Sequence, residues 1–211
     1  MMWLVGRQAR ALVDGSTAAP GDHREQLMTL DRALASPLRL AVGGVALVVA
    51  GLASLVVGLA AITIVDGRMD VASWLLLGVA LVVYAGAMAA LIVLGRSGSR
   101  LVDAWLRWFG AHREPVGRRG IWGRFFTLGS WVRAVATALV LLAALMAAGL
   151  VVAGASPGNP AGFDGDGRVF SVALGLAWGI PLLATTVTFA RGDFRTMAAI
   201  GRRVRDEYAR R

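Results

Sequence analysis

Charged side chains are absent from four long stretches of the chain, and this pattern is the strongest structural signal in the sequence. The stretches are Leu40–Val65, Val71–Gly95, Ala134–Ala155 and Val169–Ala190, of 26, 25, 22 and 22 residues. Because a helix rises about 1.5 Å per residue and bilayer hydrocarbon is about 30 Å thick, each stretch can cross with some tilt. The pattern predicts an all-α integral membrane protein with four transmembrane helices.

Arginine lies between and beyond these stretches, and its number alternates along the chain. Five arginines precede the first span, one separates spans one and two, eight lie in the central loop, one separates spans three and four, and seven follow span four. Because basic loops are retained in the cytoplasm, both termini and the central loop are expected there. We expect a multi-pass protein of a prokaryotic cytoplasmic (inner) membrane and, despite a net charge of +9, no nucleic-acid partner.

The spans divide the 211 residues into five predicted segments. These are a cytoplasmic N-terminal segment, a first transmembrane hairpin, a basic aromatic loop, a second hairpin and a basic tail, at residues 1–39, 40–95, 96–133, 134–190 and 191–211. Each hairpin has an even number of crossings, so both would face the same way in the membrane.

The N-terminal segment contains two amphipathic pieces. Asp22 and Glu25 have the spacing of a capping box, and leucines follow at helical spacing, which predicts a short amphipathic helix that ends before Pro37. Met1–Val13 is not expected to be a secretory signal, because Arg7 and Arg10 interrupt its short apolar run. We expect this first piece to lie along the membrane surface.

The two predicted hairpins resemble each other at an offset of 94 or 95 residues. A Ser-x-x-Arg sequence enters spans one and three, and three arginines after span two recur with the same spacing after span four: Arg96, Arg100 and Arg107, then Arg191, Arg195 and Arg202. The tripeptide Asp-Gly-Arg occurs at 66–68 and 166–168, in the two predicted outer turns. This internal repeat favours a duplication, with the two copies related by a pseudo-two-fold axis along the membrane normal.

The basic loop and the tail combine arginine with aromatic residues. In the loop, Leu101, Trp105 and Trp108 share one helical face, with arginines off it. Such amphipathic helices are typical of the interface above anionic lipid. The predicted contacts with inner-leaflet lipid headgroups or with a partner are Arg100, Trp105, Arg107, Trp108, Arg118, Arg119, Trp122, Arg195, Arg202 and Arg203.

Small residues recur within the spans at helical spacing. They let helix backbones approach closely, so they predict packing inside a four-helix bundle. Pairing with another membrane protein subunit, or with a second copy of this chain, is the alternative. The predicted packing residues are Gly44, Gly51, Ser54, Gly58, Gly86, Gly175 and Gly179.

The four spans carry no acidic, basic, histidine, asparagine or glutamine side chain. Intramembrane charges usually mark ion paths, so their absence argues against a proton- or sodium-coupled carrier. Pro181 should kink span four and free a carbonyl near Ala177 that a threonine or a neighbour must satisfy. Tyr84, Pro181, Thr185 and Thr186 are candidates for lining a cavity, and the Tyr84 hydroxyl is expected to bond Thr185 or Thr186.

Residues that could carry catalysis or bind a metal are few. The chain has no cysteine, and His23 and His112 lie away from any nucleophile or ligand pattern. Asp66, Asp70, Asp164 and Asp166 of the outer turns could share a metal, but turn chemistry explains them better. We expect no catalytic residue, metal or cofactor, and no enzyme activity.

These observations favour a non-catalytic protein that acts as an accessory or scaffold subunit of a membrane complex. Two alternatives remain open. The first is a transporter component for an apolar or lipid-like solute, with Tyr84 and the threonines as its lining. The second is a pore-forming or membrane-perturbing protein whose basic amphipathic helices disturb lipid.

Overall fold

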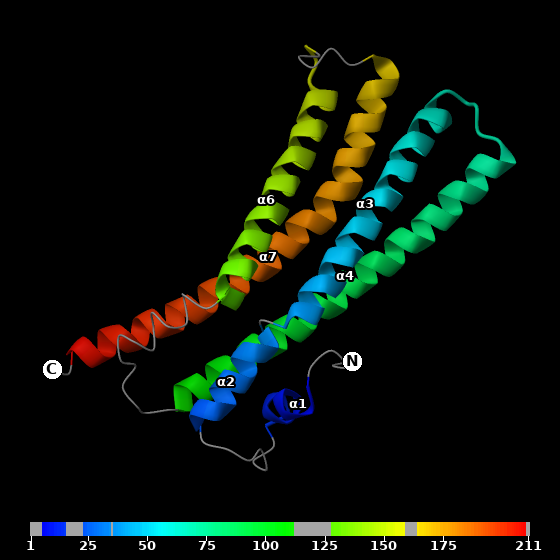
Figure 1. The fold of residues 1–211 in the computed structure, drawn as a ribbon. Helices are drawn as coiled ribbons and strands as arrows, with labels where there is room; N and C mark the ends of the chain where they lie inside the picture. The colour runs from blue at the N-terminus through cyan, green and yellow to red at the C-terminus, as the bar shows by residue number, and fades with distance from the viewer. Residues whose placement is uncertain (1–5, 16–22, 35, 112–127, 159–163, 210–211) are drawn as a thin grey trace. The chain divides into compact units, whose positions relative to one another are not determined.

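The computed structural model describes residues 6–15, 23–34, 36–111, 128–158 and 164–209, which are helical apart from short turns and caps. In chain order the helices are α1 Arg7–Val13, α2 His23–Leu34, α3 Pro37–Val65, α4 Val71–Ala111, α6 Leu128–Ala155 and α7 Gly165–Ala209 (Figure 1). Within these ranges, four helical segments, which include the predicted spans in α3, α4, α6 and α7, are long and apolar enough to cross a membrane.

The helix ends agree with the sequence pattern on one side of the spans and differ on the other. α3 ends at Val65, α4 begins at Val71 and α6 ends at Ala155, as predicted. α4 and α7, however, continue without a break far beyond the apolar stretches. The amphipathic part of the basic loop is therefore a continuation of α4, because nothing between Gly95 and Ala111 interrupts helical hydrogen bonding.

An aspartate caps the N-terminus of each of the two longest helices in the same way. The Oδ1 atom of Asp70 accepts the Ser73 N–H at 2.8 Å, and Oδ1 of Asp164 accepts the Gly167 N–H at 2.7 Å. In both cases the acceptor satisfies the third N–H of the helix, which has no partner inside the helix. The two caps lie 94 residues apart, which matches the offset of the predicted repeat.

The Asp-Gly-Arg tripeptides do not occupy equivalent positions, so this part of the repeat prediction is wrong. Asp66 and Gly67 follow the end of α3, where Gly67 has φ +64° and the Arg68 N–H bonds back to the Thr63 carbonyl at 3.0 Å. This is a glycine-terminated helix end. The second tripeptide lies inside the first turn of α7. The same three residues suit both places because aspartate favours turns as well as helix N-termini.

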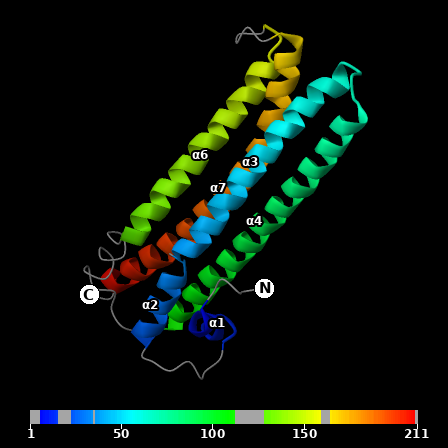
Figure 2. The same ribbon diagram turned by 45° about the vertical axis from the view of Figure 1, so that its right-hand side comes forward.

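The helices form two compact units, and α3, α4, α6 and α7 contribute to both. We call the first the apolar unit; it comprises Val42–Ile92 and Ala138–Thr186. The second, here the Trp105 unit, comprises the described parts of Met1–Ala41, Val93–Thr137 and Val187–Arg211. Within the Trp105 unit, α1 and α2 lie beside the C-terminal part of α4 (Figure 2).

Glycines of α7 and α6 bring these two helices into close contact in the apolar unit. A Cβ added at Gly175 would lie 2.7 Å from the Ala147 carbonyl oxygen, and one at Gly154 would lie 2.9 Å from the Arg168 carbonyl oxygen. Backbone atoms cannot move aside for a methyl group, so both glycines are needed for this approach. Gly154 was not among the predicted packing residues.

α3 packs against α7 through glycine and aromatic residues. A Cβ at Gly51 would meet Nε1 of Trp178 at 3.0 Å, and one at Gly58 would meet the Phe170 ring at 2.9 Å. Ser54 between them is fully buried and bonds to the Ala50 carbonyl of its own helix. Gly44 and Gly86 differ from the other predicted packing residues, because an added Cβ there would meet no atom within 4 Å.

Candidate functional site

The Trp105 unit has its own hydrophobic core, built from four helices that are distant in sequence. Trp105 of α4 is only 2% exposed, and it is buried with Leu12 of α1, Leu30 of α2 and Ile200 of α7. Its ring stacks on Phe109 at 4.6 Å between centroids. The apolar faces predicted from helical spacing in α2 and α4 therefore pack on each other, which buries them from solvent.

Two side chains of α4 hold the C-terminal end of α1. Arg107 donates a hydrogen bond from Nη2 to the Val13 carbonyl at 2.8 Å, and Nε1 of Trp108 donates to the Leu12 carbonyl at 3.2 Å. The last carbonyls of a helix have no partner inside the helix and carry partial negative charge. α1 has only seven residues, so these contacts and its buried face stabilise a helix too short to persist alone.

Three further arginines bond to carbonyls at or near helix C-terminal ends. Arg39 donates to the Ala33 carbonyl of α2 and also, at 2.9 Å, to the Ser97 hydroxyl. Arg203 donates to the Phe109 carbonyl and lies over the Phe109 ring at 4.9 Å. In the apolar unit, Arg168 donates to the carbonyls of Gly154 and Ser156, at the end of α6. A guanidinium suits this role because its donors diverge and it stays charged.

The burial of Trp105 corrects its expected role, and the contacts above show what three other predicted residues do within the chain. Trp105, predicted to face lipid or a partner, is buried in a protein core, and Arg107, Trp108 and Arg203 bond to carbonyls at or near helix ends. An amphipathic face signals an apolar neighbour without identifying it, and here the neighbours of Trp105 are α1, α2 and α7. The sequence signal that could have revealed the packing of α2 on α4 was the predicted amphipathic helix with leucines at 27, 30 and 34.

The other predicted contact residues divide into three groups. Arg100 and Arg202 are exposed on α4 and α7. Arg195 is half exposed and forms an ion pair with Asp103, with 2.8 Å between Nη2 and Oδ1. Arg118, Arg119 and Trp122 lie outside the described residues.

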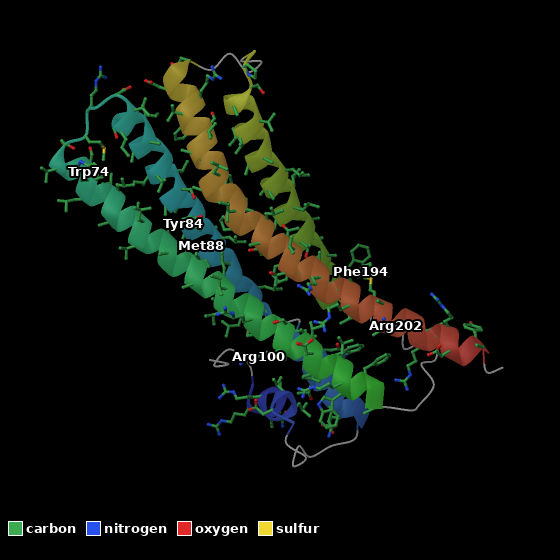
Figure 3. All side chains as sticks on the ribbon, turned by 180° about the vertical axis from the view of Figure 1, so that it is seen from behind. Trp74, Tyr84, Met88, Arg100, Phe194 and Arg202 are labelled. Atoms are coloured by element: carbon green, nitrogen blue, oxygen red, sulfur yellow. The ribbon has the colours of Figure 1, made fainter. Side chains whose placement is uncertain are left out.

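The polar groups predicted to line a cavity bond to main-chain carbonyls in the apolar unit. The Tyr84 hydroxyl of α4 donates to the Ala177 carbonyl of α7 at 2.6 Å; Tyr84 is labelled in Figure 3. Thr185 and Thr186 donate to the carbonyls of Pro181 and Leu182 in their own helix. The prediction that Tyr84 bonds to a threonine is therefore wrong. Each threonine hydroxyl donates to the carbonyl four residues earlier, and Tyr84 donates to the Ala177 carbonyl, which Pro181 leaves without its helical donor.

Asp70 and Asp164, two of the four aspartates considered for a metal site, cap helices. Hydrogen bonds from the Ser73 hydroxyl and then from the Ser73 N–H lower the pKa of Asp70 below its ordinary value. These donors stabilise the carboxylate and not the neutral acid. Where side chains are described, no three histidine, aspartate or glutamate residues come together in the manner of a metal site.

Comparisons of this chain with protein-family models, with curated proteins and with solved structures find no match.

Proposed function

We propose that this chain is a non-catalytic, four-span protein of the cytoplasmic membrane that serves as an accessory or scaffold subunit of a membrane complex. The observation that carries this proposal is the Trp105 core. It lies outside the long apolar stretches, and it joins α1 and α2 to the extended ends of α4 and α7. This unit gives the chain a packed surface outside the apolar stretches, to which a partner could bind.

The outward side chains of the apolar unit support insertion in a bilayer. Large apolar side chains are exposed on each of its helices, including Leu52, Leu75, Leu145 and Leu183. Soluble monomers rarely expose contiguous apolar patches beyond several hundred Å². Lipid tails would cover these faces at no cost, since helix backbone groups are already bonded internally.

The distribution of charge supports the proposed orientation. Asp70 and Asp164 cap the N-termini of α4 and α7 at one end of the apolar stretches. The arginines of the Trp105 unit lie beyond the other end of these stretches. Basic segments remain cytoplasmic, so the Trp105 unit would lie on the cytoplasmic side. The termini and residues 96–133 would lie there as well.

The contacts inside the apolar unit favour a structural role over solute transport. Tyr84 and the two threonines, which a solute path would use, have their hydroxyls engaged by carbonyls. Glycine contacts place α7 directly against α3 and α6. The apolar unit is therefore described best as a packed structural unit. The exposed surface of the Trp105 unit contains arginines that an acidic cytoplasmic partner could bind.

The orientation can be tested with single cysteines, because the natural chain contains none. In intact cells, a membrane-impermeant maleimide should label a cysteine placed at Asp66 and should not label one placed at Arg205. Permeabilised cells should allow both to be labelled. Labelling of both positions, or of neither, in intact cells would contradict the proposed topology.

The scaffold role is tested by cross-linking in native membranes, followed by purification in mild detergent. A stable companion protein should be recovered in a fixed ratio to this chain. A charge-reversed variant of exposed Arg100 should reduce that recovery, whereas charge reversal of outer-side Arg68 should leave it unchanged. A strictly monomeric protein without a companion would exclude the scaffold role and leave the membrane topology standing.

A further inference from the structure

The C-terminal part of α7 has an outward face that the Trp105 core does not cover. Phe194 is 75% exposed and Met197 is 51% exposed, whereas Thr196 and Ile200 in the same part of the helix are buried. Phe194 projects away from the helix (Figure 3). Two adjacent large apolar side chains are thus presented outward, beyond the end of the apolar stretch at Ala190.

Exposed arginines lie on the same side of the helix as Phe194, the first residue of this apolar pair. Arg191 is three residues before Phe194, and Arg202 is eight residues after it, so helical spacing brings all three to one face. Asp103 already neutralises Arg195, and that ion pair joins α7 to α4. The outward face therefore combines apolar side chains with guanidinium groups near them.

The corresponding part of α4 has a different surface. The residues 95 positions before Phe194 and Met197 are Ser99, which is polar, and Val102, which is buried. An exposed apolar pair is thus not a general feature of the helix segments that follow the spans. Of the two compared segments, only α7 has this pair.

We propose that Phe194 and Met197, with Arg191 and Arg202, form an interfacial anchor for anionic phospholipid headgroups of the inner leaflet. This inference rests on the membrane position proposed above. Phe194 follows the apolar stretch by roughly 6 Å along the helix, which is within the headgroup region of about 5–7 Å. Met197 follows it by roughly 10 Å and Arg202 by roughly 18 Å, so this part of α7 would incline along the membrane surface to bring both to the headgroups. Guanidinium groups bind phosphate through paired hydrogen bonds, so a phosphate-bearing, negatively charged lipid complements this face best.

The test places one nitroxide label at a time on the full chain, reconstituted in bilayers. Labels go on F194C and M197C, and the controls are L183C in the apolar stretch, I200C in the Trp105 core and R205C on the exposed end of α7. Bilayers contain phosphatidylcholine alone or an equimolar mixture with phosphatidylglycerol. Collision of each label with oxygen and with a water-soluble nickel complex reports its depth.

The anchor predicts that labels at 194 and 197 have depths between those at 183 and 205. Phosphatidylglycerol should move them toward the value at 183, and R191Q/R202Q should abolish that shift. The preference of this face for phosphatidylglycerol over phosphatidylcholine should fall about fivefold for each arginine replaced. This factor corresponds to about 1 kcal/mol, the attraction of one basic residue to an anionic membrane surface.

Three results would overturn the anchor. Water accessibility at 194 equal to that at 205 would place this face in solvent. Shielding from both reagents, as at 200, would mean that protein covers it. A depth at 194 that is the same with and without phosphatidylglycerol would remove the specificity for anionic lipid. A water-accessible label at 183 would instead contradict the membrane insertion itself, so the two failures can be told apart.

Discussion

The hydroxyl of Tyr84 in α4 donates a hydrogen bond to the carbonyl oxygen of Ala177 in α7, at 2.6 Å. Ala177 is four residues before Pro181, and proline has no N–H to offer that carbonyl. The sequence indicated that Pro181 would free this carbonyl, and the structure supplies a donor from another helix. The bond therefore compensates for a defect in α7 and ties α7 to α4.

We expect Tyr84→Phe to destabilise the protein by about 0.6 kcal/mol, and by no more than about 1.7 kcal/mol, the range for hydrogen bonds between membrane helices. Pro181→Ala restores an N–H at position 181, which can bond the Ala177 carbonyl. The cost of Tyr84→Phe should therefore fall when Pro181→Ala is also present. Unfolding in mixed micelles of the four proteins in this cycle measures the coupling, and additive effects would rule out the compensation.

Gly175→Ala should destabilise the apolar unit by about 1–3 kcal/mol, because the added methyl group meets the Ala147 backbone and the Val151 side chain. Gly86→Ala is the matched control, since it adds the same atom to a helix with open space around it. Unfolding in mixed micelles should separate the two variants. Equal stability of both would show that the close contact between α6 and α7 does not form.

Trp105→Ala should cost about 3–5 kcal/mol in the stability of the Trp105 unit, because it empties the centre of the core. Trypsin cleaves after arginine, so loosening of this unit should speed cleavage after Arg107 and Arg203. Trp74→Ala is the control, because that side chain is 58% exposed. Similar cleavage rates for both variants would mean that Trp105 does not hold the unit together.

Acidification should weaken the start of α4 through Asp70. Its pKa is lowered in the folded protein, so its contribution to stability is complete above the ordinary aspartate pKa and is lost as pH falls through the lowered value. Carboxyl NMR of Asp70 should show that Ser73→Ala raises this pKa toward the ordinary range. Asp70→Asn keeps a capping oxygen but cannot titrate, so it should remove the pH dependence of α4 fraying. An unchanged profile would mean that Asp70 does not cap α4.

Much of the helical pattern follows from the sequence because its causes are local. The absence of charged residues marks the long apolar segments. α3 begins at Pro37, and proline suits the first position of a helix because the N–H that it lacks would have no partner there. The end at Gly67 needs a positive φ, which glycine adopts readily. These signals require no knowledge of neighbouring helices.

The partners of each helix depend on distant residues and were harder to predict. Small residues occur on every side of such alanine- and glycine-rich helices, so spacing alone could not separate buried Gly58 from exposed Gly44. Arginine suggested lipid contact because of its charge, whereas Arg107 and Arg203 bond to carbonyls at or near helix ends. Which carbonyl lies within reach is decided by the fold.

The matching aspartate caps of α4 and α7 also set a length. From Asp70 to Arg96 is 26 residues and from Asp164 to Arg191 is 27, which correspond to roughly 39 and 40 Å of helix. Asp166 and Arg168 lie inside the first turn of α7, so its uncharged stretch has 22 residues against 25 in α4, or roughly 33 and 38 Å. In the proposed position, α4 should therefore tilt more than α7 in a bilayer of a given thickness, and a thinner bilayer would increase the tilt of both.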